Sequence, residues 1–552
     1  MRNNLFVWAY RCVSLYLLAA CSSSYAQQHP YPGDPYVSKV WVADQGDGTY
    51  KNPILFADYS DPDVVRVGDD FYMTASSFNC TPGLPVLHSK DLVNWTLIGH
   101  ALPEQVPVSW YNKPQHGNGV WAPAIRYHKG EFYIYYPDPD FGIYVVKAQH
   151  AAGPWSEPVL VDSGKGLIDP CPLWDNDGRA YLVHGWAASR AEINSILTVK
   201  RLSADGMKVM DAGVHVFDGH GKHPTLEGPK FYKRNGYYYI WAPGGGVTQG
   251  WQVVMRSRDI YGPYEDRIVL AQGNTPVNGP HQGAWVTTQA GEDWFIHFQD
   301  RGAYGRITHL QPVRWTNDWP VIGTDPDGDG KGAPVLTHKK PDVGKSYPVI
   351  TPQESDEFNG RQPGLQWQWH ANPDIRWSAL IPGSGYLRLF AVRRPEGSKN
   401  CWDVPNLFLQ KFPAPDFMAT TVVKLTADIA QKQAGLIVMG GDYAYVALQQ
   451  EGDTYTLRQV ICKGAEKGGE EKEFDKKEMR ENQVYLRVQV KGPDAQCTFS
   501  YSLDGRRYQP LGSSFQATPD KWIGAKVGIF CNGPHEAKNG GYADFDWFRV
   551  TR

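Results

Sequence analysis

Three carboxylates, Asp61, Asp169 and Glu227, occupy matching positions in a repeated sequence pattern. Asp169 and Glu227 each lie nine residues before a turn glycine, and Asp61 lies seven residues before another. Carboxyl groups that converge on one site do not titrate alike, because crowding and partial burial raise the pKa of one while another stays ionised. Hydrolysis of a glycosidic bond needs such a pair of acid and base. The spacing therefore predicts an acid/base site in which the third carboxylate orients the proton donor.

The repeated pattern is a glycine-containing turn followed by an aromatic, strand-like run, and it occurs five times in the first 300 residues. The turn glycines are Gly68, Gly130, Gly178, Gly236 and Gly291. Hairpins at intervals of 48 to 62 residues are typical of a β-propeller, here with five blades. The matching positions of the other two units are Trp121 and Gln282, so both should join the three carboxylates near the propeller axis.

Each carboxylate also has a purely local explanation. Asp61 and Asp169 both precede a proline, and Asp-Pro is a common start of a turn. Glu227 precedes Gly228 and Pro229, as an exposed loop residue would. The shared position in the repeat argues against three separate turn residues.

The composition is that of a turn-rich, all-β protein with a large core. Of the 552 residues, 41% are hydrophobic, 20% are charged, 57 are glycine and 41 are proline. The net charge of −3 shows no excess of positive charge of the kind that attracts nucleic acid or an anionic membrane. Aromatic residues make up 13%, and although most belong in the core, exposed rings would suit the C–H faces of sugars.

The sequence divides into five segments. Residues 1–26 contain Arg2, Arg11 and an apolar stretch and are expected to be a signal peptide. In a bacterium, this signal would export the protein to the periplasm. Leu18–Cys21 also resembles a lipobox, which would make Cys21 a lipid anchor, and the sequence leaves both kinds of processing open. No later stretch is long and apolar enough for a transmembrane span. Residues 27–50 form a lead, 51–340 the propeller, 341–353 a linker, and 354–552 a series of strand-like runs that predicts a β-sandwich.

Longer motifs resemble glycoside hydrolase family 43. They are NPILFADYSDPDVVRVGDDFYMTASSF, GVWAPAIRYHKGEFYIYY, IDPCPLWDNDGRAYLVHG, EGPKFYKRNGYYYI and HFQDRGAYGRITHLQPVRW. The segment from DEFNG onward resembles the concanavalin-like C-terminal domain of that family. The resemblance implies an inverting, five-bladed enzyme that acts on the arabinose and xylose units of plant cell-wall glycans.

The resemblance also implies roles for individual residues. Asp61 matches the general base, Glu227 the general acid, and Asp169 the acid that tunes the pKa of the donor and orients it. Trp121 matches a residue of the active-site wall, and Arg306 matches the arginine that reaches the sugar, although Arg306 could instead stabilise a blade through an ion pair. Gln282 is expected to bind substrate together with these two residues. Many relatives place a histidine on the axis, sometimes with calcium. Here that position is Gln282, preceded by His281, so no metal or other cofactor is expected, and a structural calcium ion lacks support from the sequence.

These inferences predict an exo-acting α-L-arabinofuranosidase that trims hemicellulose such as arabinoxylan or xyloglucan, with a plant cell-wall oligosaccharide as its substrate. A β-xylosidase acting on xylo-oligosaccharides is the alternative within the same class, because both pentoses fit similar pockets. A non-catalytic, glycan-binding propeller is the alternative of another class. That alternative would expect a non-acid at one of the three carboxylate positions, and all three are acids.

Overall fold

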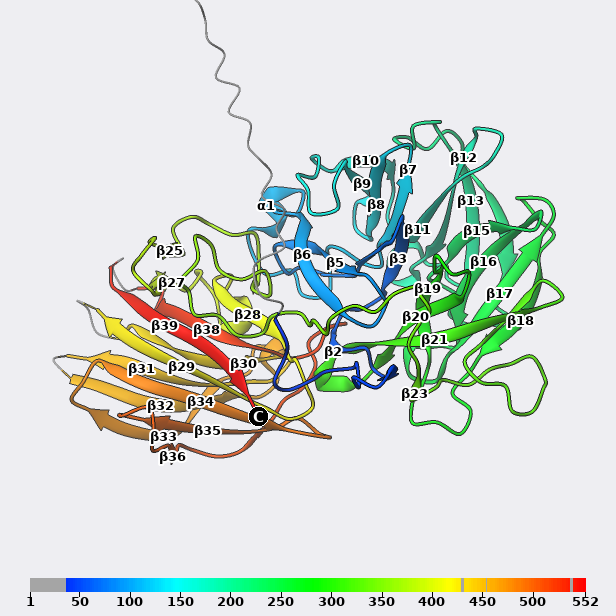
Figure 1. Cartoon of the computed structure of the whole chain (residues 1–552). Coiled ribbons are helices and arrows are strands. Elements are labelled where there is room, and N and C mark those ends of the chain that lie inside the picture. The colour runs from blue at the N-terminus through cyan, green and yellow to red at the C-terminus, as the bar shows by residue number, and fades with distance from the viewer. Residues whose placement is uncertain (1–35, 428–430, 453, 537–539) are drawn as a thin grey trace, which may run out of the picture. The chain divides into compact units, whose positions relative to one another are not determined.

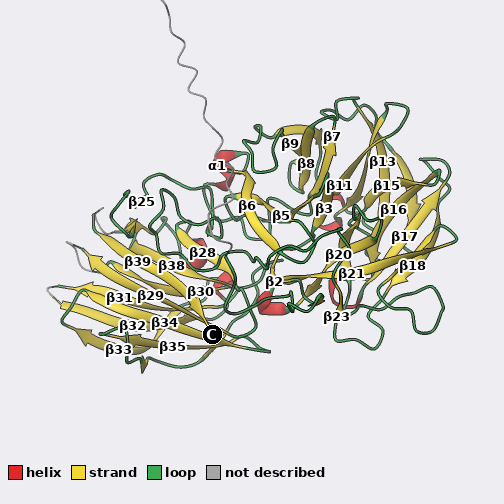
Figure 2. Ribbon diagram, in the orientation of Figure 1, coloured by secondary structure: helices red, strands yellow, loops and turns green. Residues whose placement is uncertain are grey.

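The computed structural model describes residues 36–427, 431–452, 454–536 and 540–552. These residues form one compact unit built almost entirely of strands and loops (Figure 2). The expected signal peptide, the expected anchor at Cys21 and the start of the lead lie outside the described residues. No helix within the described ranges is long and apolar enough to cross a membrane.

Five antiparallel sheets form the predicted propeller, and they run from blue to green in Figure 1. The first blade comprises β3 (Asp63–Val67), β4 (Asp70–Thr74), β5 (Gly83–Ser89) and β6 (Trp95–Leu102). The second comprises β7 (Ala124–His128), β8 (Glu131–Asp138), β9 (Gly142–Ala148) and β10 (Val159–Ser163). The third comprises β11 (Leu167–Trp174), β12 (Ala180–Trp186), β13 (Ile196–Leu202) and β14 (Val214–Asp218). The fourth comprises β15 (Lys230–Arg234), β16 (Tyr237–Gly244), β17 (Trp251–Ser257) and β18 (Glu265–Leu270).

The fifth blade closes the ring. It comprises β19 (His281–Thr287), β20 (Asp293–Asp300), β21 (Arg306–Thr316), β22 (Trp319–Ile322) and the N-terminal strand β2 (Leu55–Asp58). Because β2 pairs with β21, backbone hydrogen bonds join the start of the propeller to its end. A short pair, β1 (Thr49–Lys51) and β23 (Thr337–Lys339), ties the same two ends together once more.

The turn glycines behave as the repeat predicts. Each lies between the first and second strands of its blade, with a φ between 63° and 88°. This left-handed conformation is easy for glycine and strained for most other residues. The aromatic runs that follow are the second strands, which are buried on both faces. In β8, for example, Phe132 and Ile134 enter one core, whereas Tyr133 and Tyr135 enter another.

The C-terminal domain is the predicted sandwich of two sheets, coloured yellow-green to red in Figure 1. One sheet contains β24 (Gln368–Trp369), β27 (Val392–Arg393), β28 (Leu407–Lys411), β30 (Gln433–Met439), β31 (Tyr443–Glu451), β32 (Thr454–Cys462), β33 (Glu471–Met479) and β38 (Lys526–Gly533). The other contains β25 (Ser378–Leu380), β26 (Leu387–Phe390), β29 (Phe417–Thr426), β34 (Gln483–Lys491), β35 (Gln496–Ser502), β36 (Gln509–Pro510), β37 (Phe515–Gln516) and β39 (Tyr542–Thr551). Apolar side chains of both sheets, such as Leu436 and Phe545, share one core.

The helices are single turns within loops. They are α1 (Val108–Tyr111), α2 (Ala188–Ala191), α3 (Gly246–Gln249), η1 (Gly302–Tyr304), η2 (Cys401–Asp403) and η3 (Ala465–Lys467). The six cysteines in the described part of the chain are free and buried. Cys171 lies in an apolar core of the propeller, where its Sγ accepts from the Phe231 N–H at 3.1 Å.

Propeller and sandwich share apolar packing and hydrogen bonds. Phe56 and Tyr304 of the propeller pack into the core of the sandwich. The Gly524 N–H donates to the Asp58 carboxylate over 2.8 Å, and the Asn79 amide donates to the carbonyl of His370 over 2.8 Å. These contacts bring a sandwich segment to the mouth of the propeller.

Candidate active site

All six residues singled out from the sequence line one cavity of about 450 Å³. They are Asp61, Trp121, Asp169, Glu227, Gln282 and Arg306. Asp61, Trp121 and Glu227 lie just before the first strand of their blades, whereas Asp169 and Gln282 lie near the start of the first strands, β11 and β19. The equivalence of the repeats therefore brings one residue from each blade to a common centre. The repeat pattern does not predict the residues that complete the lining, which are Phe78, Ala122, Ile168, Val247 and Trp522.

Asp61 is buried among hydrogen-bond donors. Its carboxylate accepts from the Ser60 hydroxyl at 2.6 Å and from the Ser76 hydroxyl at 2.5 Å. The Arg306 guanidinium lies 3.3 Å from Oδ1 and 3.4 Å from Oδ2. These contacts hold the carboxylate in one orientation on the cavity wall, where it can accept a proton from a water molecule.

Glu227 has the opposite environment. Burial raises the pKa of Glu227 above its ordinary value, and the negative charges of Asp169 and Asp61 raise it further, while Arg306 opposes the shift. Its side chain keeps 33% of its surface exposed, so a molecule in the cavity can reach the carboxyl group. A carboxyl group that retains its proton near neutral pH is suited to be a general acid.

Asp169 connects the other two carboxylates. Burial and the charge of Asp61 raise the pKa of Asp169, whereas the Gly228 N–H and Lys230 oppose the shift. The Gly228 N–H donates to Asp169 Oδ2 over 2.7 Å, and Gly228 directly follows Glu227. Asp169 thereby fixes the backbone that carries the candidate acid and places a negative charge beside it.

Several lining residues have a strained backbone. Asp61, Asp169, Gln282, Phe78 and Trp522 adopt φ values of 54°, 57°, 34°, 50° and 70°. A residue other than glycine in this region costs roughly 1–3 kcal/mol, and such strain gathers at functional sites. The tertiary packing thus holds these side chains in positions that the local sequence would avoid.

Two tryptophan rings form an aromatic wall of the cavity. The rings of Trp121 and Trp522 lie edge to face, 6.1 Å apart. The Arg306 guanidinium lies 5.8 Å from the Trp522 ring and 4.8 Å from the Phe298 ring. Trp522 belongs to the sandwich, so both domains build the cavity. An aromatic wall with a few polar groups is typical of a sugar-binding pocket.

His281, the residue before Gln282, is the histidine that could bind a metal ion near the propeller axis. Among the described residues, neither of its ring nitrogens has a hydrogen-bond partner, and Nε2 lies 3.7 Å from Glu227 Oε1. Burial lowers the pKa of His281 to about 3, which leaves a neutral imidazole. Calcium prefers a cage of oxygen ligands, which a ring nitrogen does not supply. His281 by itself therefore does not make a calcium site.

Comparisons with known proteins agree with this geometry. The model of glycosyl hydrolases family 43 matches residues 50–320, and that of the beta xylosidase C-terminal concanavalin A-like domain matches residues 355–551. A protein of Xylanibacter ruminicola, provisionally named a β-xylosidase, is 43% identical over 89% of this chain and 88% of its own length. The chain belongs to glycosyl hydrolases family 43.

Other members of family 43 carry two kinds of name. A β-xylosidase of Formosa agariphila is 32% identical over 97% of this chain and 96% of its own length. A non-reducing end α-L-arabinofuranosidase of Bacteroides ovatus is 29% identical over 92% of this chain and 96% of its own length. The crystal structure of a xylan β-1,4-xylosidase from Bacillus halodurans, 27% identical, superposes with a TM-score of 0.77 over 91% of this chain and 100% of that chain. The protein is accordingly a glycosidase with the two-domain architecture of this family.

Proposed function

We propose that the protein is an exo-acting, inverting glycosidase that releases a pentose from the non-reducing end of plant cell-wall glycans. The observation that carries the proposal is the convergence of Asp61, Asp169 and Glu227 on one cavity in three different environments. The cavity is bounded by all five blades and by Trp522, and such a setting suits the end of a glycan better than its middle.

In the proposed mechanism, Glu227 donates its proton to the glycosidic oxygen as the bond between that oxygen and the anomeric carbon breaks. Asp61 takes a proton from a water molecule, whose oxygen attacks the anomeric carbon from the opposite face. Attack on the opposite face inverts the configuration of the released sugar. Arg306 stays paired with Asp61 and holds it in place for this step.

Among pentosides, we propose β-xylosides as the first substrate class, because the relatives at 43% and 32% identity carry β-xylosidase names. The preference for arabinose that the sequence suggested remains the second candidate, supported by the arabinofuranosidase of Bacteroides ovatus. Hydrolysis of aryl β-xyloside and aryl α-L-arabinofuranoside should be compared by kcat/KM. A higher value for the xyloside supports the first candidate, a higher value for the arabinofuranoside supports the second, and no hydrolysis of either would leave only a glycan-binding role.

Replacement of Asp169 should change the pH dependence of the reaction. The charge of Asp169 is one cause of the raised pKa of Glu227, so Asp169→Asn should lower that pKa. Glu227 must be protonated to act, and the alkaline limb of kcat/KM against pH should therefore move to lower pH. Asp218→Asn, at an exposed aspartate, is the control and should leave the profile unchanged. An active Asp169→Asn enzyme with the profile of the wild type would show that Asp169 does not tune the acid.

Export of the protein, whether to the periplasm or as a lipoprotein anchored at Cys21, is also proposed here, from the N-terminal sequence alone. The mass of the mature protein recovered from the producing bacterium would distinguish the two. A diacylglycerol adduct on an N-terminal Cys21 indicates a lipoprotein, and an unmodified N-terminus at Gln27 indicates ordinary cleavage.

A further inference from the structure

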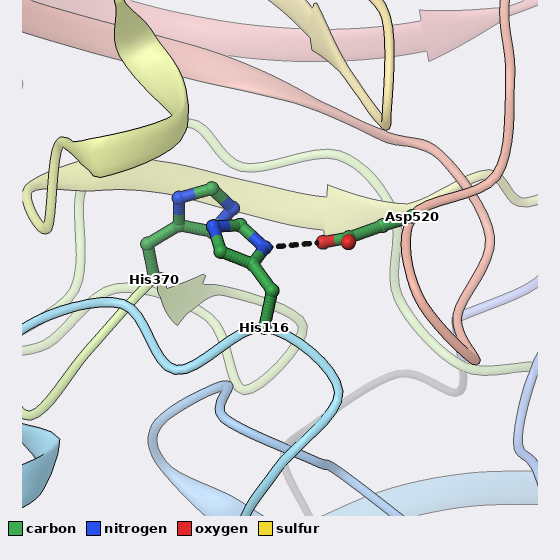
Figure 3. A group of neighbouring side chains, drawn as sticks. All are labelled: His116, His370 and Asp520. Carbon is green, nitrogen blue, oxygen red and sulfur yellow. Dashed lines mark hydrogen bonds and ion pairs between the residues drawn. The ribbon is translucent and has the colours of Figure 1, made fainter. Parts of the chain in front are cut away.

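Three buried side chains gather where the propeller meets the sandwich, outside the cavity. They are His116, from the propeller loop between α1 and β7, and His370 and Asp520 of the sandwich (Figure 3). His116 Nδ1 lies 2.8 Å from Asp520 Oδ2, and the two side chains are only 7% and 4% exposed. The other ring nitrogen of His116, Nε2, lies 2.9 Å from the carbonyl oxygen of Trp402.

The contacts of His116 are those of a charged imidazolium. Both ring nitrogens face an oxygen that only accepts hydrogen bonds, so each nitrogen must carry a hydrogen. Burial opposes the charge, but the Asp520 carboxylate and the Trp402 carbonyl outweigh it and raise the pKa of His116. The indole of Trp402 stacks on the His116 ring with the centroids 3.5 Å apart, and the His370 and His116 rings lie edge to face with the centroids 4.9 Å apart. Burial and the charge of His116 lower the pKa of His370 to about 3, so His370 stays neutral.

A direct ion pair explains this geometry better than a metal site does. A distance of 2.8 Å between nitrogen and oxygen is that of a direct hydrogen bond. A metal ligand needs a free lone pair on its nitrogen, and the contacts of His116 occupy both nitrogens. The cluster is therefore a buried bridge between the two domains.

The bridge lies at one end of the segment that reaches the cavity. We call residues Asp520–Gly524 the Trp522 strap. At its far end, the Gly524 N–H donates to Asp58 Oδ2 over 2.8 Å. Asp58 Oδ1 in turn accepts from the backbone N–H of Arg306 over 2.9 Å. Trp522 therefore lies between two contacts with the propeller, the His116–Asp520 ion pair on one side and the hydrogen bond from Gly524 to Asp58 on the other.

The propeller loop that provides His116 also positions Trp121. The indole N–H of Trp121 donates to the carbonyl of Gly117 over 2.9 Å. Gly117 packs so tightly on the strap that an added Cβ would lie 2.7 Å from the side chain of Lys521. Consequently, His116 and Gly117 both contact the strap, and Gly117 also holds the other tryptophan of the wall.

We propose that the buried His116–Asp520 ion pair positions Trp522 and Trp121 as the aromatic wall of the sugar pocket, and so sets how well the pocket binds its substrate. This inference rests on the proposed glycosidase function. His116 and Asp520 do not line the cavity, so they are positioning residues.

Steady-state kinetics on the better aryl pentoside test this role. Asp520→Asn keeps the shape of the side chain and removes its charge, and His116→Ala removes the partner. Each should lower kcat/KM by about 10- to 100-fold, mainly through KM, because a misplaced wall weakens substrate positioning. Asp520→Glu, which restores the charge, should recover part of the loss. His220→Ala is the matched control, because His220 pairs with Asp218 at 2.7 Å on the exposed surface, and it should leave KM unchanged.

A double variant shows whether the pair acts through the strap. If it does, adding His116→Ala to Trp522→Ala should lower kcat/KM by a smaller factor than His116→Ala does in the wild type, because one of the two positioned residues is already gone. Fully additive losses would overturn the proposal. So would variants that unfold at a lower temperature yet keep the kcat/KM of the wild type, because that result describes a purely structural bridge.

Hydrogen exchange tests the ion pair without relying on activity. Peptides that cover 515–525 should exchange faster in Asp520→Asn and His116→Ala than in the wild type, and at the wild-type rate in His220→Ala. Unchanged exchange in both variants would overturn the proposal even if the enzyme hydrolyses pentosides. A wild-type protein inactive on both pentosides would instead overturn the proposed function. Elemental analysis that found a stoichiometric transition metal, lost in His370→Ala, would replace the ion pair with a metal centre.

Discussion

Glu227→Ala is expected to lose about 10²- to 10⁴-fold in activity on natural pentosides while retaining much of its activity on dinitrophenyl pentosides. A sugar alkoxide is a poor leaving group and needs the proton that Glu227 supplies. Dinitrophenolate is stable as an anion and needs that proton far less. The measurement is kcat/KM for a xylo-oligosaccharide and for the dinitrophenyl xyloside, with the arabinosides in parallel.

Two comparisons make the Glu227 result specific. Glu227→Gln keeps the size of the side chain and should show the same contrast between leaving groups. Glu157→Ala, at an exposed glutamate, should leave both substrates unaffected. Equal losses on both kinds of substrate in Glu227→Ala would count against the role of proton donor.

Asp61→Asn is expected to lose activity on both kinds of substrate, again by about 10²- to 10⁴-fold, because attack by water is needed whatever group leaves. Asparagine can keep the contacts with Ser60 and Ser76, but it leaves the buried Arg306 without its counter-charge. Removing one partner of a buried pair commonly costs about 3–5 kcal/mol of stability, so thermal unfolding must accompany the kinetics.

Rescue by a small anionic nucleophile can show whether an Asp61 variant is inactive because it lacks the base or because it is misfolded. Azide needs no base to attack, so it should partly restore turnover of the activated pentoside by Asp61→Ala and form a glycosyl azide. The wild type and Glu157→Ala serve as controls and should gain nothing from azide. A folded Asp61 variant with near-normal activity on both substrates would exclude the role of general base.

The sequence allowed the propeller and most of the pocket to be predicted, because both follow from a repeat. A turn glycine and an aromatic second strand mark each blade, as at Gly178 and Tyr181. Counting back from the glycine reaches the start of the innermost strand. Positions equivalent in the repeat are equivalent in space, and Asp169 and Glu227 therefore meet.

The contribution of the sandwich could not be predicted in this way. Trp522 lies more than 400 residues from Asp61 and belongs to no repeat. Its place over the cavity depends on packing between two domains and on the bond from Gly524 to Asp58. Phe78 reaches the pocket through a left-handed backbone that its own sequence does not favour. The ion pair between His116 and Asp520 likewise joins residues whose proximity only the tertiary structure reveals.

The central claim is that Asp61 and Glu227 act as base and acid in a single displacement by water. Proton NMR of the first sugar released from an aryl β-xyloside, recorded before mutarotation, tests it most directly. The account predicts that α-xylose appears first, with the β-anomer growing in only as the sugar equilibrates. Release of β-xylose as the first product would show net retention and contradict the account, because retention requires a covalent intermediate on a carboxylate.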